Sequence, residues 1–386
     1  MRKVCLFGAS GSIGKQTLDV IYHHPEDFEL VGFSVGHRVN AIDKILKRFN
    51  NVKAICVQEE SSLPLFKQKY PHITFYHGDE GLLSLIDNCG AEMVVNALVG
   101  FVGLKPTLHT LKKNLILCLA NKESLVVGGE LVNELLMHGY GKLYPIDSEH
   151  SALLKCLLVK NKGVNKLMLT ASGGAFRNLN REQLKTVTAE DALKHPTWKM
   201  GNKITIDCAT MVNKAFEVIE AHYLYNYPAS RIGITLHDES YIHSYVTYKD
   251  GTLRAEESKP DMRNPIRFAL YECKIPFETV TAHEIIDFKK YHFHAFDPKR
   301  YPMVQFSKTV INKKGTYGAV FNAANEVAVN YFLKGKIKFL DIEKIIASQM
   351  KNHVNILNPT YEQLYKVDKI TREQTLKMIE RKMNKQ

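Results

Sequence analysis

The segment Val4–Gly14, "VCLFGASGSIG", joins a short apolar run to three glycines spaced three residues apart. Gly8, Gly11 and Gly14 permit a tight turn and a close approach of the backbone to a ligand, and a helix is expected to begin at Ser12. Free N–H groups in the first turn of a helix bind pyrophosphate well. The segment therefore predicts a dinucleotide-binding loop, and the alternative is a packed loop in some other α/β protein.

The pattern continues from residue 3 to residue 146, where short apolar runs alternate with amphipathic stretches. The runs are "KVCLFG", "FELVGFSV", "VKAICV", "MVVNALVG", "LILCLA" and "KLYPI". This alternation is typical of a parallel sheet with helices on both faces. The predicted fold is α/β, with an N-terminal Rossmann-like sheet, an α+β catalytic domain and a small helical C-terminal domain.

The predicted domain boundaries follow from changes in this pattern. Residues 1–146 are expected to bind the nucleotide, and residues 147–275 to form a catalytic, metal-binding and dimerisation domain. That domain includes a flap near residues 190–201 and a hairpin turn at "YKDGTL". A linker is expected over 276–300, and amphipathic stretches such as "NAANEVAVNYFL" predict a helical domain over 301–386.

Composition restricts the class of partner. Lysine and arginine outnumber aspartate and glutamate by 52 to 40, so anionic partners are favoured. The basic residues are scattered and there is one tryptophan, which disfavours a nucleic-acid module and favours a phosphorylated small molecule. No apolar run approaches the roughly 20 residues of a membrane span. Seven cysteines without a CxxC pair, and no secretion signal, predict a cytoplasmic protein.

The end of the second apolar run indicates which dinucleotide is bound. An NAD-binding domain of this type has an acidic residue there, which holds the ribose 2′-hydroxyl. This chain has Gly36, His37 and Arg38 and no acid. Basic groups suit a 2′-phosphate, so NADP is predicted over NAD, while an ordinary surface histidine and arginine remain the alternative.

Two carboxylates follow the last run of the sheet, in "YPIDSEHSALL". If the chain stays extended there, Asp147 and Glu149 point to the same side and can bind one ion at the carboxyl end of a strand. Oxygen ligands suit Mg²⁺ or Mn²⁺. The same residues could instead mark the start of a helix, with Asp147 or Ser148 as its cap.

A third carboxylate lies in "CATMVNKAFEVIEAHYLY". On a single helix, Thr210, Asn213, Lys214 and Glu217 share one face, whereas the apolar residues cover the other. Such a polar face could bind a polar ligand. It could also be a solvated face that carries a Lys214–Glu217 ion pair.

Taken together, the motifs resemble those of the 1-deoxy-D-xylulose 5-phosphate reductoisomerases. They are, in order, "GASGSIG", "LANKESLV", "PIDSEHSA", "LTASGGAFR", "HPTWKMG", "DCATMVNKAFEVIEA", "PDMRNPI" and "NAANEVAV". The resemblance implies a homodimeric enzyme that uses NADPH and Mg²⁺, Mn²⁺ or Co²⁺. It would rearrange and reduce 1-deoxy-D-xylulose 5-phosphate to 2-C-methyl-D-erythritol 4-phosphate in isoprenoid precursor synthesis.

The resemblance also implies roles for individual residues. The metal ligands would be Asp147, Glu149 and Glu217, and Lys122 and His195 would complete the catalytic set. Substrate would be bound by Ser148, Ser172, His195, Trp198, Cys208, Asn213, Lys214 and His243, of which Ser172, Asn213 and Lys214 hold its phosphate. NADPH would be bound by Gly8, Ala9, Ser10, Gly11, Ser12, Ile13, Gly36, His37, Arg38, Asn121, Glu123, Met200 and Gly201. His195 and Trp198 would lie on a flap that closes over the substrate, with Met200 toward the nicotinamide.

Three departures from the family pattern stand out. Cys208 replaces the usual serine, and because a thiol is a weak donor we expect a weaker grip on the phosphate. "GHR" replaces "GKN", which keeps positive charge beside the nucleotide. Tyr245, Glu257 and Ser258 are also unusual and are expected to affect the dimer or the scaffold. An inactive relative, or an NADPH dehydrogenase that needs no metal, remains the alternative, and metal dependence would separate the two enzymes.

Overall fold

The computed structural model describes residues 1–194, 200–274 and 290–384. The chain forms two compact units. Unit 1 comprises Met1–Asn121, Leu131–Asp147 and Asp261–Thr279, and unit 2 comprises Lys122–Glu130, Ser148–Pro260 and Val280–Gln386. The predicted catalytic and C-terminal helical domains fall mainly in unit 2, and the boundary between them stays a prediction.

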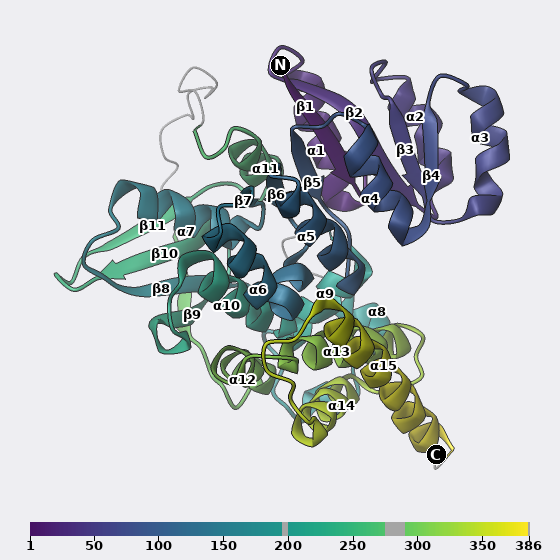
Figure 1. Cartoon of the computed structure of the whole chain (residues 1–386). Helices are drawn as coiled ribbons and strands as arrows, with labels where there is room; N and C mark the ends of the chain where they lie inside the picture. The colour runs from purple at the N-terminus through teal and green to yellow at the C-terminus, as the bar shows by residue number, and fades with distance from the viewer. Residues whose placement is uncertain (195–199, 275–289, 385–386) are drawn as a thin grey trace. The chain divides into compact units, whose positions relative to one another are not determined.

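Unit 1 contains a seven-stranded parallel sheet with the strand order β4-β3-β2-β1-β5-β6-β7 (Figure 1). The strands are β1 (Arg2–Phe7), β2 (Phe28–Gly36), β3 (Ala54–Val57), β4 (Thr74–His77), β5 (Met93–Asn96), β6 (Ile116–Leu119) and β7 (Lys142–Pro145). The order reverses at β1, which is where ligands bind in sheets of this kind. The six predicted runs are confirmed as strands. The apolar pattern did not predict β4, an edge strand whose two end residues are exposed.

Apolar residues cover both faces of this sheet. Along β1, Val4 and Leu6 belong to one buried cluster, while Cys5 and Phe7 belong to another. Successive side chains of a strand point to opposite faces, so helices must cover both sides. The helices are α1 (Ser12–His23), α2 (Ile42–Leu46), α3 (Leu63–Lys69), α4 (Gly78–Asn88), α5 (Leu104–Lys112), α6 (Lys122–Met137) and α11 (Arg263–Leu270), and α6 contributes to both units.

Unit 2 contains a five-stranded mixed sheet with the order β11-β10-β8-β9-β12. Its strands are β8 (Val164–Ala171), β9 (Ile232–His237), β10 (Ile242–Tyr248), β11 (Leu253–Glu257) and β12 (Phe293–Ala295). Only the β8–β9 pair is parallel among the described strands of this sheet. The hairpin predicted at "YKDGTL" joins β10 to β11, with Gly251 at a φ of +83°.

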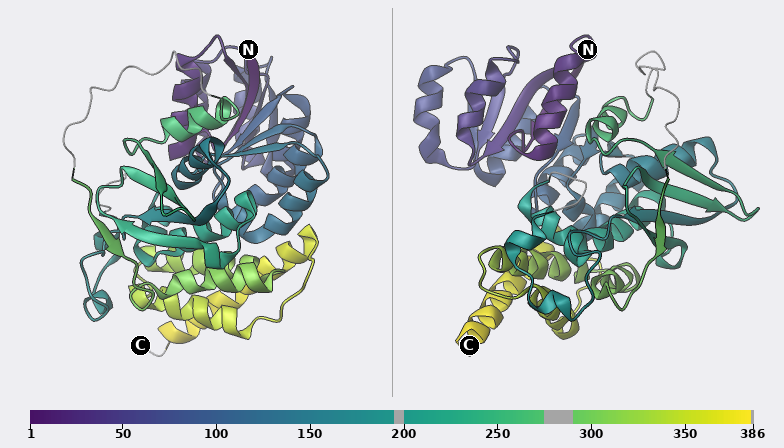
Figure 2. Two further views of the ribbon diagram at one scale, coloured as in Figure 1. Left: turned by 90° about the vertical axis from the view of Figure 1, so that its left-hand side faces the viewer. Right: turned by 180° about the vertical axis from the view of Figure 1, so that it is seen from behind.

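Helices make up the rest of unit 2. They are α7 (Ser148–Val159), α8 (Ala189–Ala192), α9 (Asn202–Thr210), α10 (Val212–Tyr225), α12 (Gln305–Lys313), α13 (Tyr317–Leu333), α14 (Phe339–Asn352) and α15 (Tyr361–Met383). A single buried apolar cluster joins α7, α9 and α10 to the sheet and to the helices from α12 onward, where α13 packs against α14 and α15 (Figure 2). Among the described helices, none has the length and apolar character needed to cross a membrane.

Candidate active site

The glycine loop after β1 is closely packed in unit 1. Gly8 has a φ of +73°, and a Cβ atom there would lie 2.5 Å from the carbonyl oxygen of Ala97. A Cβ atom on Gly14 would lie 2.2 Å from the carbonyl oxygen of Gly8. Only glycine fits both positions, because a side chain would force the strand, the loop and the helix apart. The loop thereby brings the start of α1 directly to the end of β1.

The start of α1 is suited to binding an anion. The helix begins at Ser12 as predicted, with Gly11 at its N-cap. No side-chain hydrogen bond caps it, and its first turn contains no acidic residue. The helix dipole and the N–H groups of the first turn therefore favour negative charge at this point.

The two basic residues after β2 differ in their surroundings. Arg38 Nη1 donates a hydrogen bond to the carbonyl oxygen of Ser10 at 3.2 Å, so its guanidinium lies beside the glycine loop. His37 Nδ1 lies 3.4 Å from Glu59 Oε1, and both side chains are exposed. Arg38 is therefore the better placed of the two to meet a phosphate bound at this loop.

The carboxylates predicted to bind a metal lie close together. Candidate ligand atoms of Asp147, Glu149 and Glu217 all lie within 4.8 Å of one another. Asp147 directly precedes α7 and Glu149 lies in its first turn, so the assumption that the chain is extended here was wrong and the predicted helix start is correct. The carboxylates of Asp147 and Glu149 still lie close together, because the start of α7, and not the alternation of side chains along a strand, places them there.

Glu217 lies on a helix that begins after a break in helical geometry at Met211. Met211 adopts a left-handed conformation with a φ of +63°, which ends α9 at Thr210 and lets α10 begin at Val212. The prediction of one continuous helix that carries Thr210, Asn213, Lys214 and Glu217 was therefore wrong. Thr210 is the last residue of α9, and its hydroxyl donates a hydrogen bond to the carbonyl oxygen of Asp207. Asn213, Lys214 and Glu217 are buried in the first turns of α10. This excludes a solvated face.

Two lysines of unit 2 lie beside Glu149 and Glu217. Lys122 Nζ donates to Asn213 Oδ1 at 2.7 Å and lies 3.4 Å from Glu217 Oε1. Lys214 Nζ donates to Glu149 Oε1 at 2.7 Å and also to Glu217. Although burial works against its charged form, these two carboxylates raise the pKa of Lys214 above its ordinary value. Lys214 is therefore charged at neutral pH.

The chemistry of this donor set fits a divalent ion. Three carboxylates provide hard oxygen ligands, which suit Mg²⁺ and Mn²⁺ better than softer metals. Carboxylates gathered this closely repel one another unless positive charge lies between them. Lys122 and Lys214 supply such charge in this structure, and a cation bound by the three carboxylates would add to it.

The loop after β8 lies against α9. Ser172 Oγ accepts a hydrogen bond from the backbone N–H of Gly174 at 3.2 Å. A Cβ atom on Gly174 would lie 2.7 Å from the carbonyl oxygen of Cys208, so this loop closely approaches α9 at Cys208. Burial raises the pKa of the Cys208 thiol to about 12, which keeps it protonated. Ser172 and Cys208 thus occupy neighbouring elements, as a shared phosphate site requires.

The remaining predicted substrate residues are only partly described. His243 Nε2 lies 3.1 Å from Ser258 Oγ, and burial lowers the pKa of its imidazole, which is neutral at pH 7 as a result. Ser148 Oγ donates to Glu149 Oε2 at 2.5 Å. His195 and Trp198 lie outside the described residues, so the predicted flap is not tested. Met200 and Gly201 directly precede α9.

Two residues predicted to bind cofactor already have protein partners. Asn121 Nδ2 donates to the carbonyl oxygens of Leu98 and Gly100 at 3.0 Å each and so holds the loop after β5. Glu123 accepts a hydrogen bond from Lys203 at 2.8 Å. Lys203 and Asp207 were not among the predicted site residues, although their spacing of four residues on a helix is a recognisable ion-pair signal.

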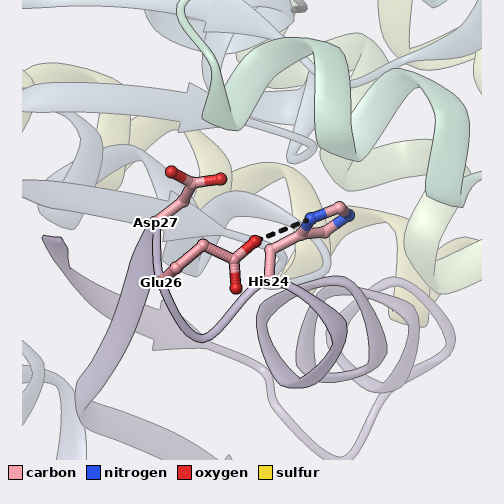
Figure 3. Close-up of side chains that lie close together, drawn as sticks. All are labelled: His24, Glu26 and Asp27. Atoms are coloured by element: carbon pink, nitrogen blue, oxygen red, sulfur yellow. Dashed lines mark ion pairs between the residues drawn. The ribbon is translucent and has the colours of Figure 1, made fainter. Parts of the chain in front are cut away.

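A second group of potential metal ligands lies at the turn between α1 and β2. It contains His24, Glu26 and Asp27, and Figure 3 shows the carboxylate of Glu26 turned toward the ring of His24. His24 Nδ1 lies 3.7 Å from Glu26 Oε1, and Glu26 is exposed. Asp27 accepts a hydrogen bond from the hydroxyl of Tyr271, so it has a structural role in joining this turn to the end of α11. We assign no ion to this group.

Comparison with protein families gives a consistent result along the chain. Residues 4–129 match the family model described as 1-deoxy-D-xylulose 5-phosphate reductoisomerase. Residues 143–225 match the model of its C-terminal domain, and residues 258–374 match the DXP reductoisomerase C-terminal domain. The three matches follow one another in sequence order.

Curated relatives and solved structures cover nearly the whole chain. It is 42% identical to 1-deoxy-D-xylulose 5-phosphate reductoisomerase 2 of Bacillus thuringiensis subsp. konkukian, over 98% of this chain and 100% of that protein. It is 41% identical to the 1-deoxy-D-xylulose 5-phosphate reductoisomerase of Macrococcus caseolyticus, over 95% of this chain and 97% of that protein. A crystal structure of DOX-P reductoisomerase with NADPH, fosmidomycin and magnesium superposes with a TM-score of 0.91 at 30% identity, covering 98% of each chain. The structure of the Zymomonas mobilis enzyme with NADPH superposes with a TM-score of 0.88 at 34% sequence identity, covering 98% of this chain and 99% of that chain.

Proposed function

The chain belongs to the 1-deoxy-D-xylulose 5-phosphate reductoisomerase family, and from this premise we propose how its own residues perform the family's reaction. The protein is an NADPH-dependent enzyme that rearranges and reduces 1-deoxy-D-xylulose 5-phosphate to 2-C-methyl-D-erythritol 4-phosphate, with a divalent metal ion as cofactor. The observation that carries the assignment of its site is the convergence of Asp147, Glu149 and Glu217. Substrate-dependent oxidation of NADPH that a chelator abolishes tests it.

Asp147, Glu149 and Glu217 are the proposed ligands of the metal ion. When bound, a divalent ion supplies Lewis-acid polarisation of the substrate carbonyl. Lys122 is proposed to stabilise negative charge on substrate oxygens, since its ammonium lies beside Glu217 and Asn213. Ser148, next to Glu149, would bind a substrate hydroxyl.

The substrate phosphate is proposed to bind at the start of α10. Asn213 and Lys214 lie in the first turns of this helix, where the dipole favours an anion. Lys214 supplies charge, and the amide of Asn213 supplies an oriented donor. Ser172 and Cys208 would complete the site from the loop after β8 and from α9. The hydroxyl of Ser172 is the stronger donor of these two.

NADPH is proposed to bind at the glycine loop of unit 1, with its pyrophosphate at the start of α1. Ala9, Ser10 and Ile13 lie on this loop and helix. The 2′-phosphate would meet Arg38, whose guanidinium already lies beside Ser10. The partners of Asn121 and Glu123 support positioning roles for these two side chains, so contacts to the cofactor there would come from the backbone.

Replacing Arg38 with alanine is expected to raise KM for NADPH about 10- to 100-fold, since one charge-assisted hydrogen bond contributes about 1.5–3 kcal/mol. KM for NADH should change by no more than about twofold, because NADH has no 2′-phosphate. His37→Ala is the matched control and should have the smaller effect, given the contact of His37 with Glu59. Steady-state kinetics with both cofactors measure the preference for NADPH over NADH. If the ratio of kcat/KM for NADPH to kcat/KM for NADH in Arg38→Ala equals that of the wild type, Arg38 does not bind the 2′-phosphate.

Further family features complete the proposal. His195 and Trp198 would cover the substrate and Met200 would lie toward the nicotinamide, while neutral His243 would line the substrate site. A homodimer is proposed from family membership, and β11 supports it because most of its residues are exposed at an edge of the sheet in unit 2. A cytoplasmic location is proposed as well, supported by seven cysteines that are all free.

A further inference from the structure

One partly buried lysine in unit 2, Lys203, links two carboxylates that the mechanism above does not use. Lys203 Nζ lies 2.8 Å from Glu123 Oε1 and 3.0 Å from Asp207 Oδ2. Both carboxylates are nearly inaccessible to solvent. Glu123 lies in the first turn of α6, whereas Lys203 and Asp207 lie on α9. The ammonium therefore ties the start of α6 to α9.

Two further contacts fix this arrangement. Asn325 of α13 donates from Nδ2 to Asp207 Oδ1 at 2.8 Å, and its side chain is fully buried. Lys203 Nζ lies 5.5 Å from the ring centroid of Phe216 on α10, where a cation is attracted to the face of the ring. The network therefore joins four helices, and each charged group in it has a partner of opposite charge.

Tight packing of α6 on α13 supports the same conclusion. A Cβ atom on Gly318 of α13 would lie 1.9 Å from the carbonyl oxygen of Val126 on α6. The two helices therefore touch through their backbones at this point. Because a protein interior transmits displacements rather than absorbing them, the first turn of α6 cannot shift unless this contact and the ion pairs of Lys203 shift as well.

The catalytic candidate Lys122 precedes Glu123 directly. Its ammonium must reach Asn213 and Glu217 on α10, which are 91 and 95 residues away in sequence. The network acts on both sides of this contact, because Glu123 holds the start of α6 while Lys203 and Asp207 hold the helix that leads into α10. A change in these ion pairs would move Lys122 relative to Glu217.

We propose that Lys203, Glu123 and Asp207, supported by Asn325, form a positioning network that holds Lys122 at its place beside Glu217. The inference rests on the catalytic role proposed above for Lys122. It assigns a new function to Lys203, Asp207 and Asn325, and it gives the Glu123 side chain a positioning role in place of direct contact with NADPH.

The test is steady-state kinetics of the full-length enzyme with saturating Mg²⁺ for four variants, Lys203→Met, Asp207→Asn, Asn325→Leu and Glu123→Gln. A misplacement of about 1 Å costs up to about 100-fold in rate, so kcat should fall by about 10- to 100-fold in Lys203→Met and Asp207→Asn. Asn325→Leu should lower kcat by about three- to tenfold, because it removes only the support of Asp207. In all four variants, KM for NADPH should stay within about threefold of the wild-type value. Lys203→Arg, which keeps the charge, should restore most of kcat relative to Lys203→Met.

Glu343→Gln is the matched control. Glu343 is another buried carboxylate of unit 2 and forms an ion pair at 2.6 Å with Arg181, which is not a member of this network. It should lower the melting temperature without changing kcat. Asn325→Leu and Asp207→Asn keep the test valid if Lys203→Met does not fold.

Two results would overturn the inference. If Asp207→Asn and Asn325→Leu keep kcat within about twofold of the wild type while the melting temperature falls, the network is only structural. If Glu123→Gln raises KM for NADPH at unchanged kcat, Glu123 is a cofactor ligand. Lys122→Ala separates this failure from that of the proposed function, because an unchanged kcat in that variant would disprove the role of Lys122 itself.

Discussion

Replacing Glu217 with glutamine is expected to lower kcat by about 1,000-fold. Glu217 is 1% exposed and contacts Lys122, Lys214 and Asn213. Glutamine has nearly the same shape but no charge, so the variant loses a proposed metal ligand. Lys122 and Lys214 also lose a negatively charged partner. Lewis-acid stabilisation is worth several kcal/mol, and about 1.4 kcal/mol corresponds to a factor of ten in rate.

The measurement is substrate-dependent NADPH oxidation, with NADPH binding measured separately by fluorescence titration. Binding should persist, since the glycine loop and Arg38 lie in unit 1. Glu220→Gln is a closely matched control, because Glu220 lies one turn further along α10, is 3% exposed and pairs with His150 at 3.2 Å. It should affect stability more than turnover. Activity of Glu217→Gln near the wild-type level would contradict the proposed metal site.

Replacing Lys214 with methionine is expected to raise KM for 1-deoxy-D-xylulose 5-phosphate by about 10- to 100-fold. A hydrogen bond to a charged group contributes about 1.5–3 kcal/mol, which corresponds to this range. Methionine preserves much of the apolar stem of lysine and removes the ammonium that pairs with Glu149 and Glu217. The variant should also unfold at a lower temperature, because two buried carboxylates lose a partner.

Lys122→Met provides the comparison for Lys214. Both lysines are buried beside Glu217, yet the proposal assigns Lys214 to the phosphate and Lys122 to charge that develops in the reaction. Lys122→Met should therefore act mainly on kcat and Lys214→Met mainly on KM, which initial-rate kinetics over a range of substrate concentrations distinguish. If KM in Lys214→Met equals that of the wild type, Lys214 does not bind the phosphate.

The nucleotide-binding part of the fold was predictable because its signals are local. Three glycines, an adjoining apolar strand and a helix start lie within eleven residues, and the structure places all of them as expected. The edge strand β4 was not predicted because its ends are polar and exposed, and Phe75 is the one buried residue of its four. Strand prediction depends on apolar patterning, which is weakest at the edges of a sheet.

The candidate site was predictable only in part. Asp147 and Glu149 were recognisable as a pair, but their convergence with Glu217 depends on contacts across about 70 residues of sequence, and the family resemblance supplied it. The left-handed Met211 that divides α9 from α10 could not be predicted, since methionine has no preference for that conformation. The Lys203 network was missed for a similar reason, because only the partner four residues away is visible in the sequence.

The most direct test of the account is NADPH oxidation by the wild-type enzyme with 1-deoxy-D-xylulose 5-phosphate, followed by absorbance in the presence of Mg²⁺ or Mn²⁺ and then with excess chelator. Oxidation should depend on the substrate, stop with chelator and return when the metal ion is restored. Turnover that persists without metal would contradict the role of the three carboxylates. Absence of turnover with either metal, while NADPH still binds, would contradict the assigned reaction.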